Sequence, residues 1–212
     1  MTHLYLIRHG DFAIGLEDGR YRNQGLTPLG VRQAERLRDR LATGEIKADV
    51  LIASPLPRAR QTAEILAPAL GLPVVLDAAV EEWRNEDGSL SEEAFMERVM
   101  VTPSEQMPFA RWVPGCENWL EFCIRASDAL NRIVREHAGQ TTVIVCHNGI
   151  IEVSFSLFFG LSGAPLQRLN VEAGHASLTH WQKVTPPPGF LSGWLLESYN
   201  DRSHLPGAER TT

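Results

Sequence analysis

Residues 4–10, LYLIRHG, place a short apolar run directly before an arginine, a histidine and a glycine. Residues 3–7 are predicted to form a buried strand, because the run is short and rich in aliphatic side chains. A lone Arg8-His9 pair after such a run is more often part of an ordinary surface loop. Whether the Arg8-His9 pair belongs to a functional site therefore depends on whether other apolar runs are also followed by arginine or histidine.

Two other apolar runs end in the same way. Residues 49–53 (DVLIA) precede SPLPRARQTA, which contains Arg58, and residues 141–145 (TTVIV) precede CHNG, which contains His147. In open α/β sheets, ligands bind beside the carboxyl ends of the strands. The three polar segments are therefore expected to converge on one crevice.

Strand-like and helix-like segments alternate along the chain, which predicts an α/β fold with a mostly parallel central sheet and helices on both faces. The strand candidates are residues 3–7, 49–53, 72–76, 141–145, 176–184 and 193–199. Helical patterns run from Thr27-Pro28 to about Gly44, from the loop after Ser54 to Gly71, within 91–100, over 118–137 and after Gly149. We expect one domain, residues 1–212, with a cap insertion at about 82–115.

Three further segments are expected to lack regular structure. Residues 11–25 have no clear periodicity and are predicted to be an irregular connection. The PPPG run at 186–189 indicates a turn or loop, and the residues after His204 are expected to be loose.

Composition excludes several classes of protein. The 212 residues are 43% hydrophobic and 22% charged, with a net charge of −6, which fits a soluble globular protein and argues against a nucleic-acid surface. No apolar run is long enough to cross a membrane, and no secretory signal is expected at the N-terminus. The three cysteines have neither a zinc-site spacing nor an even count, so we expect a cytoplasmic protein without a metal site.

The clustered residue types suit a phosphoryl group. Arginine presents a planar fork of donors that matches phosphate oxygens, and a histidine imidazole can attack phosphorus and hold it covalently. The overall negative charge does not exclude an anion, since one arginine at about 4 Å contributes roughly 4 kcal/mol at an effective dielectric of 20.

The motifs LIRHG, SPLPRARQTA and VIVCHNG, in this order, resemble those of the histidine phosphatase superfamily, also called phosphoglycerate mutase-like. The resemblance extends from Leu4 to about Leu205 and includes TPLGVRQAERL and the tail WLLESYNDRSHL. It implies a phosphatase-type phosphomonoesterase that needs no metal ion or organic cofactor. Its partners would be a small-molecule phosphomonoester and the product inorganic phosphate, with no nucleic acid or membrane.

The resemblance also implies roles for particular side chains. His9 would be the nucleophile that becomes a phosphohistidine, Arg8 and Arg58 would bind the phosphate, and His147 would donate a hydrogen bond to the transferring group. The general acid would come from Val80-Glu81-Glu82, where Glu82 is preferred and Glu81 is the alternative. Only one of the two can face the pocket if this segment is extended, because side chains alternate between faces.

Departures from the family pattern bear on the reaction. The chain has Asp11-Phe12 after RHG, Gly15 where mutases carry asparagine, and Asn148 where a glycine is usual, and it lacks the extended tail of the mutases. These changes favour hydrolysis over a phosphoglycerate mutase reaction. A non-catalytic phosphate-binding module and a phosphohistidine protein phosphatase are further alternatives.

The remaining polar residues are expected to be structural. Arg60 is expected to be solvated or paired with an acidic neighbour, and Cys146 to point into the core. The other histidines have no metal-ligand spacing; they are His3, His137, His175, His180 and His204. His175 is the possible exception to a structural role, because it lies in a loop before a strand. The mixed side chains of residues 82–115 favour a small or medium, partly apolar alcohol as the leaving group.

Overall fold

The computed structural model describes residues 1–161, 171–184 and 193–211. Its strands are β1 (Thr2–Arg8), β2 (Phe12–Glu17), β3 (Arg20–Leu26), β4 (Val50–Ala53), β5 (Val74–Leu76), β6 (Thr141–Cys146), β7 (Leu178–Val184) and β8 (Gly193–Asp201). Its helices are α1 (Pro28–Leu41), α2 (Pro57–Leu70), α3 (Glu92–Val101), α4 (Trp119–Glu136) and α5 (Asn148–Phe158), with short 3-10 turns η1 (Ala78–Val80) and η3 (Gly207–Glu209). The predicted PPPG turn lies outside the described residues.

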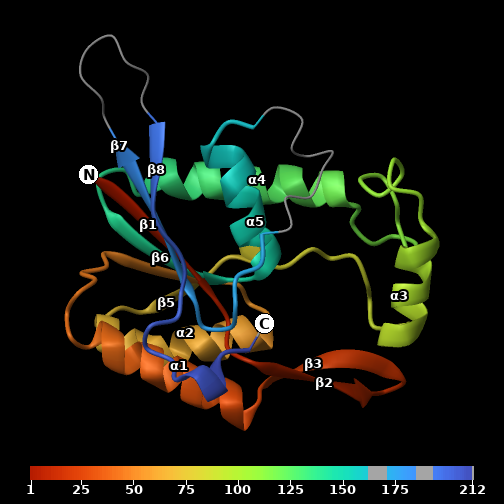
Figure 1. Ribbon diagram of the computed structural model, residues 1–212, viewed down its shortest axis with the longest axis horizontal. Coiled ribbons are helices and arrows are strands. Elements are labelled where there is room, and N and C mark those ends of the chain that lie inside the picture. Colours follow the sequence, from red (N-terminus) through yellow and green to blue (C-terminus); the bar gives the residue numbers. More distant parts are fainter. Residues whose placement is uncertain (162–170, 185–192, 212) are drawn as a thin grey trace.

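The central sheet confirms the predicted α/β class. Its strand order is β5-β4-β6-β1-β7-β8, in which β5, β4, β6 and β1 are parallel neighbours and β7 runs antiparallel between β1 and β8 (Figure 1). The carboxyl ends of β1, β4 and β6 therefore lie at one edge, where the three polar segments follow.

One face of the sheet is covered by α1 and α2. The helices bury a stripe of small and aliphatic side chains against the strands, including Leu37, Leu41, Ala63 and Leu66. Thr27 caps α1 through its side chain, which accepts from the Gly30 amide, and Gly71 ends α2 with a φ of 66°.

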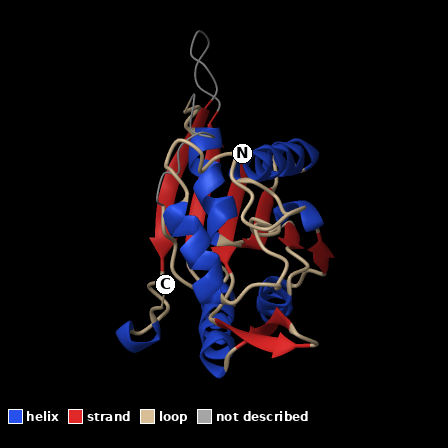
Figure 2. Cartoon of the chain, turned by 90° about the vertical axis from the view of Figure 1, so that its right-hand side faces the viewer, coloured by secondary structure: helices blue, strands red, loops and turns tan. Residues whose placement is uncertain are grey.

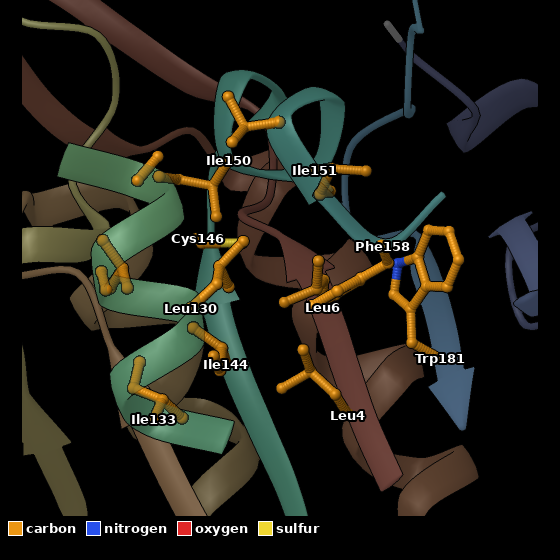
Figure 3. Packing of buried hydrophobic residues seen from close by; sticks show 14 of the residues in the cluster. Leu4, Leu6, Leu130, Ile133, Ile144, Cys146, Ile150, Ile151, Phe158 and Trp181 are labelled. Carbon is orange, nitrogen blue, oxygen red and sulfur yellow. The ribbon is translucent and has the colours of Figure 1, made fainter. Parts of the chain in front are cut away.

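The other face is covered by α4 and α5. Figure 3 shows Leu130 and Ile133 of α4 packed toward Leu4, Leu6 and Ile144 of the sheet. Side chains alternate between the two faces along each strand, so Leu4 and Leu6 face α4 and α5. Cys146 also lies in this core, fully buried, as predicted.

The prediction that residues 11–25 are irregular was wrong. They form most of a two-stranded hairpin, β2–β3, which stands apart from the central sheet (Figures 1 and 2). Asp18 and Gly19 make the turn with φ of 49° and 74°, the left-handed pair that a two-residue hairpin turn needs. The Asp-Gly signal was present, but most side chains of both strands are exposed, so no buried alternation accompanied it.

Residues 82–115, which we call the cap segment, carry α3 at the place predicted for a helix. Ser91 caps this helix by accepting from the Ala94 amide. The cap segment meets the hairpin, because the Tyr21 amide donates to the Gly88 carbonyl at 2.8 Å and Arg20 pairs with Asp87 at 2.9 Å. The two elements thus form a joined rim beside the sheet edge (Figure 1).

The prediction that the residues after His204 are loose was wrong for the segment up to Thr211. The turn η3 and the residues after it return to the carboxyl end of β1, where the His175 amide donates to the Thr211 carbonyl at 3.1 Å. No helix in the described ranges is long and apolar enough to span a membrane.

Candidate active site

The loop after β1 is held tightly in place. The His9 amide donates to the Cys146 carbonyl at 3.1 Å, and the Gly10 amide donates to Thr62 Oγ1 at 3.1 Å. A Cβ on Gly10 would lie 2.6 Å from the Gly30 carbonyl oxygen of α1, so only glycine allows this close packing. The glycine of the RHG motif therefore fixes where His9 sits.

The His9 ring has a defined protonation pattern. Its Nδ1 lies 2.8 Å from the Gly10 carbonyl oxygen, which can only accept, so Nδ1 carries the proton. Arg58 Nε donates to the other ring nitrogen, Nε2, at 2.9 Å. Burial lowers the pKa of His9 well below its ordinary value, and His147 and Arg58 lower it further. The imidazole is therefore neutral at pH 7, with a lone pair on Nε2.

Arg58 lies in the first turn of α2, beside His9. Its guanidinium carbon is 4.6 Å from the centre of the Phe12 ring, and the Phe12 edge meets the His9 ring at 5.1 Å. Burial lowers the pKa of Arg58, while the negative charge of Glu82 opposes this. Arg58 stays charged at neutral pH, because a guanidinium is not deprotonated in proteins.

Arg8 ends β1 and is largely buried. One guanidinium nitrogen, Nη1, donates to the Ala173 carbonyl, whereas Nε has no hydrogen-bond partner among the described residues. Burial lowers the pKa of Arg8, and Glu82 and Glu172 oppose the shift. A buried donor without a partner on a charged side chain suits an anion that binds there.

His147 follows β6 and caps α5. Its ring is fully buried, lies 5.1 Å from the His9 ring between centroids, and has Nε2 2.8 Å from Ser54 Oγ. Burial lowers the pKa of His147 well below its ordinary value, and the charges of Arg58 and Arg8 act in the same direction. The structure thus brings His9, Arg8, Arg58 and His147 together, at the carboxyl ends of the strands.

Glu82 and Glu81 point to different surroundings. Glu82 accepts from the Trp83 amide at 2.9 Å and from the Gly149 amide, in the first turn of α5, at 3.3 Å. Glu81 instead pairs with Arg84 at 2.8 Å. Of the two carboxylates, Glu82 is therefore the one placed beside the histidine motif, next to His147.

The residues that hold Glu82 in place were missed at the sequence level. Arg125 of α4 donates to the carbonyls of Ala79, Glu81 and Glu82 at 2.9–3.1 Å, and its guanidinium also pairs with Glu117 at 2.8 Å. One arginine thus ties the η1 segment to α4. Its spacing from Glu82 gives no sequence signal, because the contact depends on how α4 packs.

His175 was set apart from the histidines predicted to be structural because it lies in a loop before a strand, and the structure places its ring beside His9. Its ring centroid lies 5.5 Å from that of His9, and the side chain is buried. The tail residue Thr211 contacts it, with Oγ1 2.9 Å from Nδ1. The sequence signal was its place in the loop three residues before β7, the strand that pairs with β1.

A pocket of about 440 Å³ opens beside Arg58, between the β2–β3 hairpin and α3. Its lining is partly apolar and partly polar, comprising Phe12, Ile14, Tyr21, Arg22, Asn23, Arg58, Glu86, Leu90, Ser91, Glu92, Phe95 and Met96. Because Phe12 and Arg58 line this pocket and also contact His9, the pocket adjoins the histidine cluster.

A model of the histidine phosphatase superfamily, branch 1, matches residues 4–187 of this chain. The chain belongs to this superfamily. Among curated relatives, a probable phosphoglycerate mutase, GpmB, of Yersinia pestis is 31% identical over 97% of this chain and 95% of its own length. This member of the superfamily thus has a curated relative that is named a probable mutase.

Solved structures of phosphatases share the fold. The α-ribazole phosphatase of Shigella flexneri aligns with a TM-score of 0.74 at 21% identity, covering 94% of this chain and 96% of that one. A phosphoserine phosphatase variant of Entamoeba histolytica, in complex with phosphoserine, aligns with a TM-score of 0.71 at 20% identity, over 97% and 100% of the two chains.

Other side chains that the sequence singled out lie outside the cluster. Arg60 pairs with Glu64 at 2.7 Å on the exposed side of α2, as predicted. Trp83 packs against Trp112 of the cap segment and Trp119 of α4, with centroids 5.0 and 5.1 Å away. Within the described residues, no group of three or more histidine, cysteine or carboxylate side chains could hold a metal ion.

Proposed function

We propose that this protein hydrolyses phosphomonoesters through a phosphohistidine on His9, without a metal ion. The observation that carries the proposal is the fixed tautomer of His9, whose Nδ1 proton is held by the Gly10 carbonyl so that Nε2 has the lone pair. The charges of Arg8 and Arg58 supply the electrostatic stabilisation that the phosphoryl oxygens need.

In the first step, His9 Nε2 attacks phosphorus and the bond to the ester oxygen breaks. Arg58, which donates to Nε2 at 2.9 Å, turns its donors to the phosphoryl oxygens as the new bond forms. Glu82, protonated for this step, gives its proton to the leaving oxygen. Such an acid contributes roughly 10²–10⁴-fold to the rate.

In the second step, a water molecule attacks the phosphorus of phosphohistidine. Glu82, now a carboxylate, takes a proton from this water, the nitrogen–phosphorus bond breaks, and inorganic phosphate leaves. His147 donates a hydrogen bond to the transferring group, and the pair it forms with Ser54 keeps its ring in position. His9 returns to the neutral form favoured by its buried surroundings.

We take the cap segment, residues 82–115, as the part that selects the alcohol. The pocket between α3 and the hairpin lies beside Arg58 and has apolar walls from Phe12, Phe95 and Met96, broken by a few polar groups. This lining favours a small or medium, partly apolar alcohol over a highly anionic one.

A phosphoglycerate mutase reaction is the alternative that the 31% identical relative favours. It requires the phosphoryl group to return from His9 to a second hydroxyl of the substrate instead of to water. Gly15 stands where the mutases carry an asparagine, which argues for fewer contacts to a phosphoglycerate.

The first experiment measures phosphate release from p-nitrophenyl phosphate in EDTA, with His9→Ala beside the wild type. Hydrolysis that survives chelation and falls at least about 10³-fold in the variant supports the proposal. Interconversion of 2- and 3-phosphoglycerate without phosphate release would support the mutase instead. Orthovanadate binding without turnover of any ester would favour a phosphate-binding module.

A further inference from the structure

One ring nitrogen of His175 has a hydrogen-bond partner among the described residues, and the other has none. The side chain is 4% exposed, Nδ1 contacts Thr211 Oγ1 at 2.9 Å, and Nε2 is buried without a hydrogen-bond partner among the described residues. A buried imidazole nitrogen without a partner is costly unless a ligand satisfies it. Which nitrogen carries the proton decides what that ligand could be.

A chain of hydrogen bonds with fixed direction reaches this ring. The Asp11 amide donates to Gln33 Oε1 at 2.8 Å, which orients the amide group of Gln33. Gln33 Nε2 then donates to the Glu209 carbonyl at 2.7 Å and to Thr211 Oγ1 at 2.9 Å. The Thr211 hydroxyl therefore accepts from Gln33, and its own proton is available for His175.

This direction favours one tautomer of His175. Among the described residues the Thr211 hydroxyl proton has no acceptor other than Nδ1, and a hydroxyl that donates to Nδ1 leaves the proton of the neutral imidazole on Nε2. The Asp11 carboxylate is the competing acceptor, but its Oδ1 lies 3.8 Å from Nδ1, and its Oδ2 accepts from Thr27 Oγ1 at 2.5 Å. Burial and the charge of Arg8 lower the pKa of His175 to about 4, so the ring is neutral at pH 7.

The surroundings of His175 suit an anion. The His9 ring has His147 at 5.1 Å and His175 at 5.5 Å between centroids. Arg8, the charge that acts most strongly on His175, has its own unpartnered buried Nε. Two donors without acceptors, both close to the nucleophile, match the oxygens of a phosphoryl group.

We propose that His175 donates a hydrogen bond from Nε2 to the phosphoryl group at His9, and that Thr211 is a positioning residue that fixes the tautomer needed for this. The inference rests on the proposed function in that it concerns the same phosphate site. A purely structural His175 would need only Nδ1, to anchor the C-terminal segment. The Nε2–H donor distinguishes the two roles.

The tautomer can be read without any turnover. Long-range ¹H–¹⁵N NMR of the full chain, with the His175 signals assigned by their loss in His175→Gln, should show the proton on Nε2. Addition of orthovanadate, a phosphate mimic, should shift the Nε2 and Hε1 signals of His175. A proton on Nδ1, or His175 signals unchanged at saturating orthovanadate, would overturn the proposal.

Matched variants separate donation from anchoring. Glutamine places its amide nitrogen near the position of Nε2, so His175→Gln should bind orthovanadate within about 5-fold of wild type, whereas His175→Leu should lose roughly 10- to 100-fold. Thr211→Ser, which keeps the hydroxyl, should match wild type, and Thr211→Val should bind several-fold more weakly with a mixed tautomer. An equal loss of orthovanadate affinity in His175→Gln and His175→Leu would contradict the proposed donor role.

The readouts also keep this inference separate from the hydrolase proposal. Orthovanadate affinity and the NMR signals do not require that any ester be hydrolysed. A protein that fails to hydrolyse p-nitrophenyl phosphate but shows the Nε2 response would refute the proposed reaction alone. An active enzyme whose His175 NMR signals do not shift on addition of orthovanadate would refute the role of His175 alone.

Discussion

The two ends of the site are built differently. At the phosphate end, His9 and His147 are at most 2% exposed and are held by the Gly10 carbonyl and by Ser54. At the alcohol end, α3 contributes no buried residue at all. The first end is shaped by strands and backbone groups that cannot move without disturbing the core, whereas the second is lined by side chains of α3 and of the mostly exposed β2–β3 hairpin. Changes at the first end should therefore affect catalysis strongly, and changes at the second should affect only substrate choice.

The largest effect is expected at Arg58. Arg58→Lys keeps a charge but loses the planar fork and the contact with the Phe12 ring, so kcat/KM for an aryl phosphate should fall roughly 10²- to 10³-fold. Arg60→Lys is the matched control, because Arg60 lies two residues away and pairs with Glu64 on the exposed surface. Steady-state kinetics on both variants would contradict the assignment if their losses were alike.

The next effect concerns the placement of Glu82. A Cβ at residue 149 would lie 2.3 Å from Glu82 Oε1 and 2.8 Å from the Phe122 ring, so Gly149→Ala should displace the carboxylate. We expect kcat to fall about 10- to 100-fold while orthovanadate affinity changes little. Gly193→Ala, which adds a Cβ into open space, is the control. Unchanged kcat in Gly149→Ala would argue against Glu82 as the acid.

Acid should destabilise the phosphate end. His175 has a folded pKa of about 4 and an unfolded pKa near 6.5, so the unfolded chain binds the extra proton between these values. Its contribution to the free energy of unfolding is present above pH 6.5 and is lost as pH falls toward 4. The free energy of unfolding, measured with urea at several pH values near 5, should rise with pH less steeply in His175→Gln than in wild type. The two slopes should differ by about 1.4 kcal/mol per pH unit. Identical slopes would mean that the ring is not kept neutral by the fold.

The smallest effect is expected at the alcohol end. Met96→Ala removes an apolar group from the pocket wall and should lower kcat/KM for an aryl phosphate only about 3- to 10-fold, through KM, with orthovanadate affinity unchanged. Met100→Ala on the same helix is the control, since that side chain is 79% exposed and does not line the pocket. A loss at Met96 as large as that at Arg58 would remove the distinction between the two ends.

The clustering of the polar residues at the carboxyl ends of the strands could be predicted because its signals are local. Each of Arg8, Arg58 and His147 lies at or just beyond a strand whose apolar pattern is readable, and parallel strands bring those ends to one edge. The helices α2 and α4 were likewise marked, by the stop at Gly71 and by the amphipathic pattern over 118–137.

What could not be predicted depends on contacts between distant parts of the chain. Gln33 and Thr211 are 178 residues apart, and Arg125 reaches a carbonyl 43 residues away, so no spacing rule connects them. The β2–β3 hairpin was missed for another reason, because exposure of its side chains leaves little hydrophobic pattern to read.

The contact between hairpin and cap segment has a consequence for remodelling this enzyme. Gly88 has a φ of 81°, and a Cβ there would lie 2.3 Å from the Tyr21 carbonyl oxygen, while the Tyr21 amide bonds to the Gly88 carbonyl. A cap taken from a relative would fit only if its own hairpin came with it, or if it kept a glycine at this point. For exchanging substrate preference between family members, the transplantable piece is therefore residues 12–26 together with 82–115, two stretches separated by more than fifty residues of unchanged scaffold.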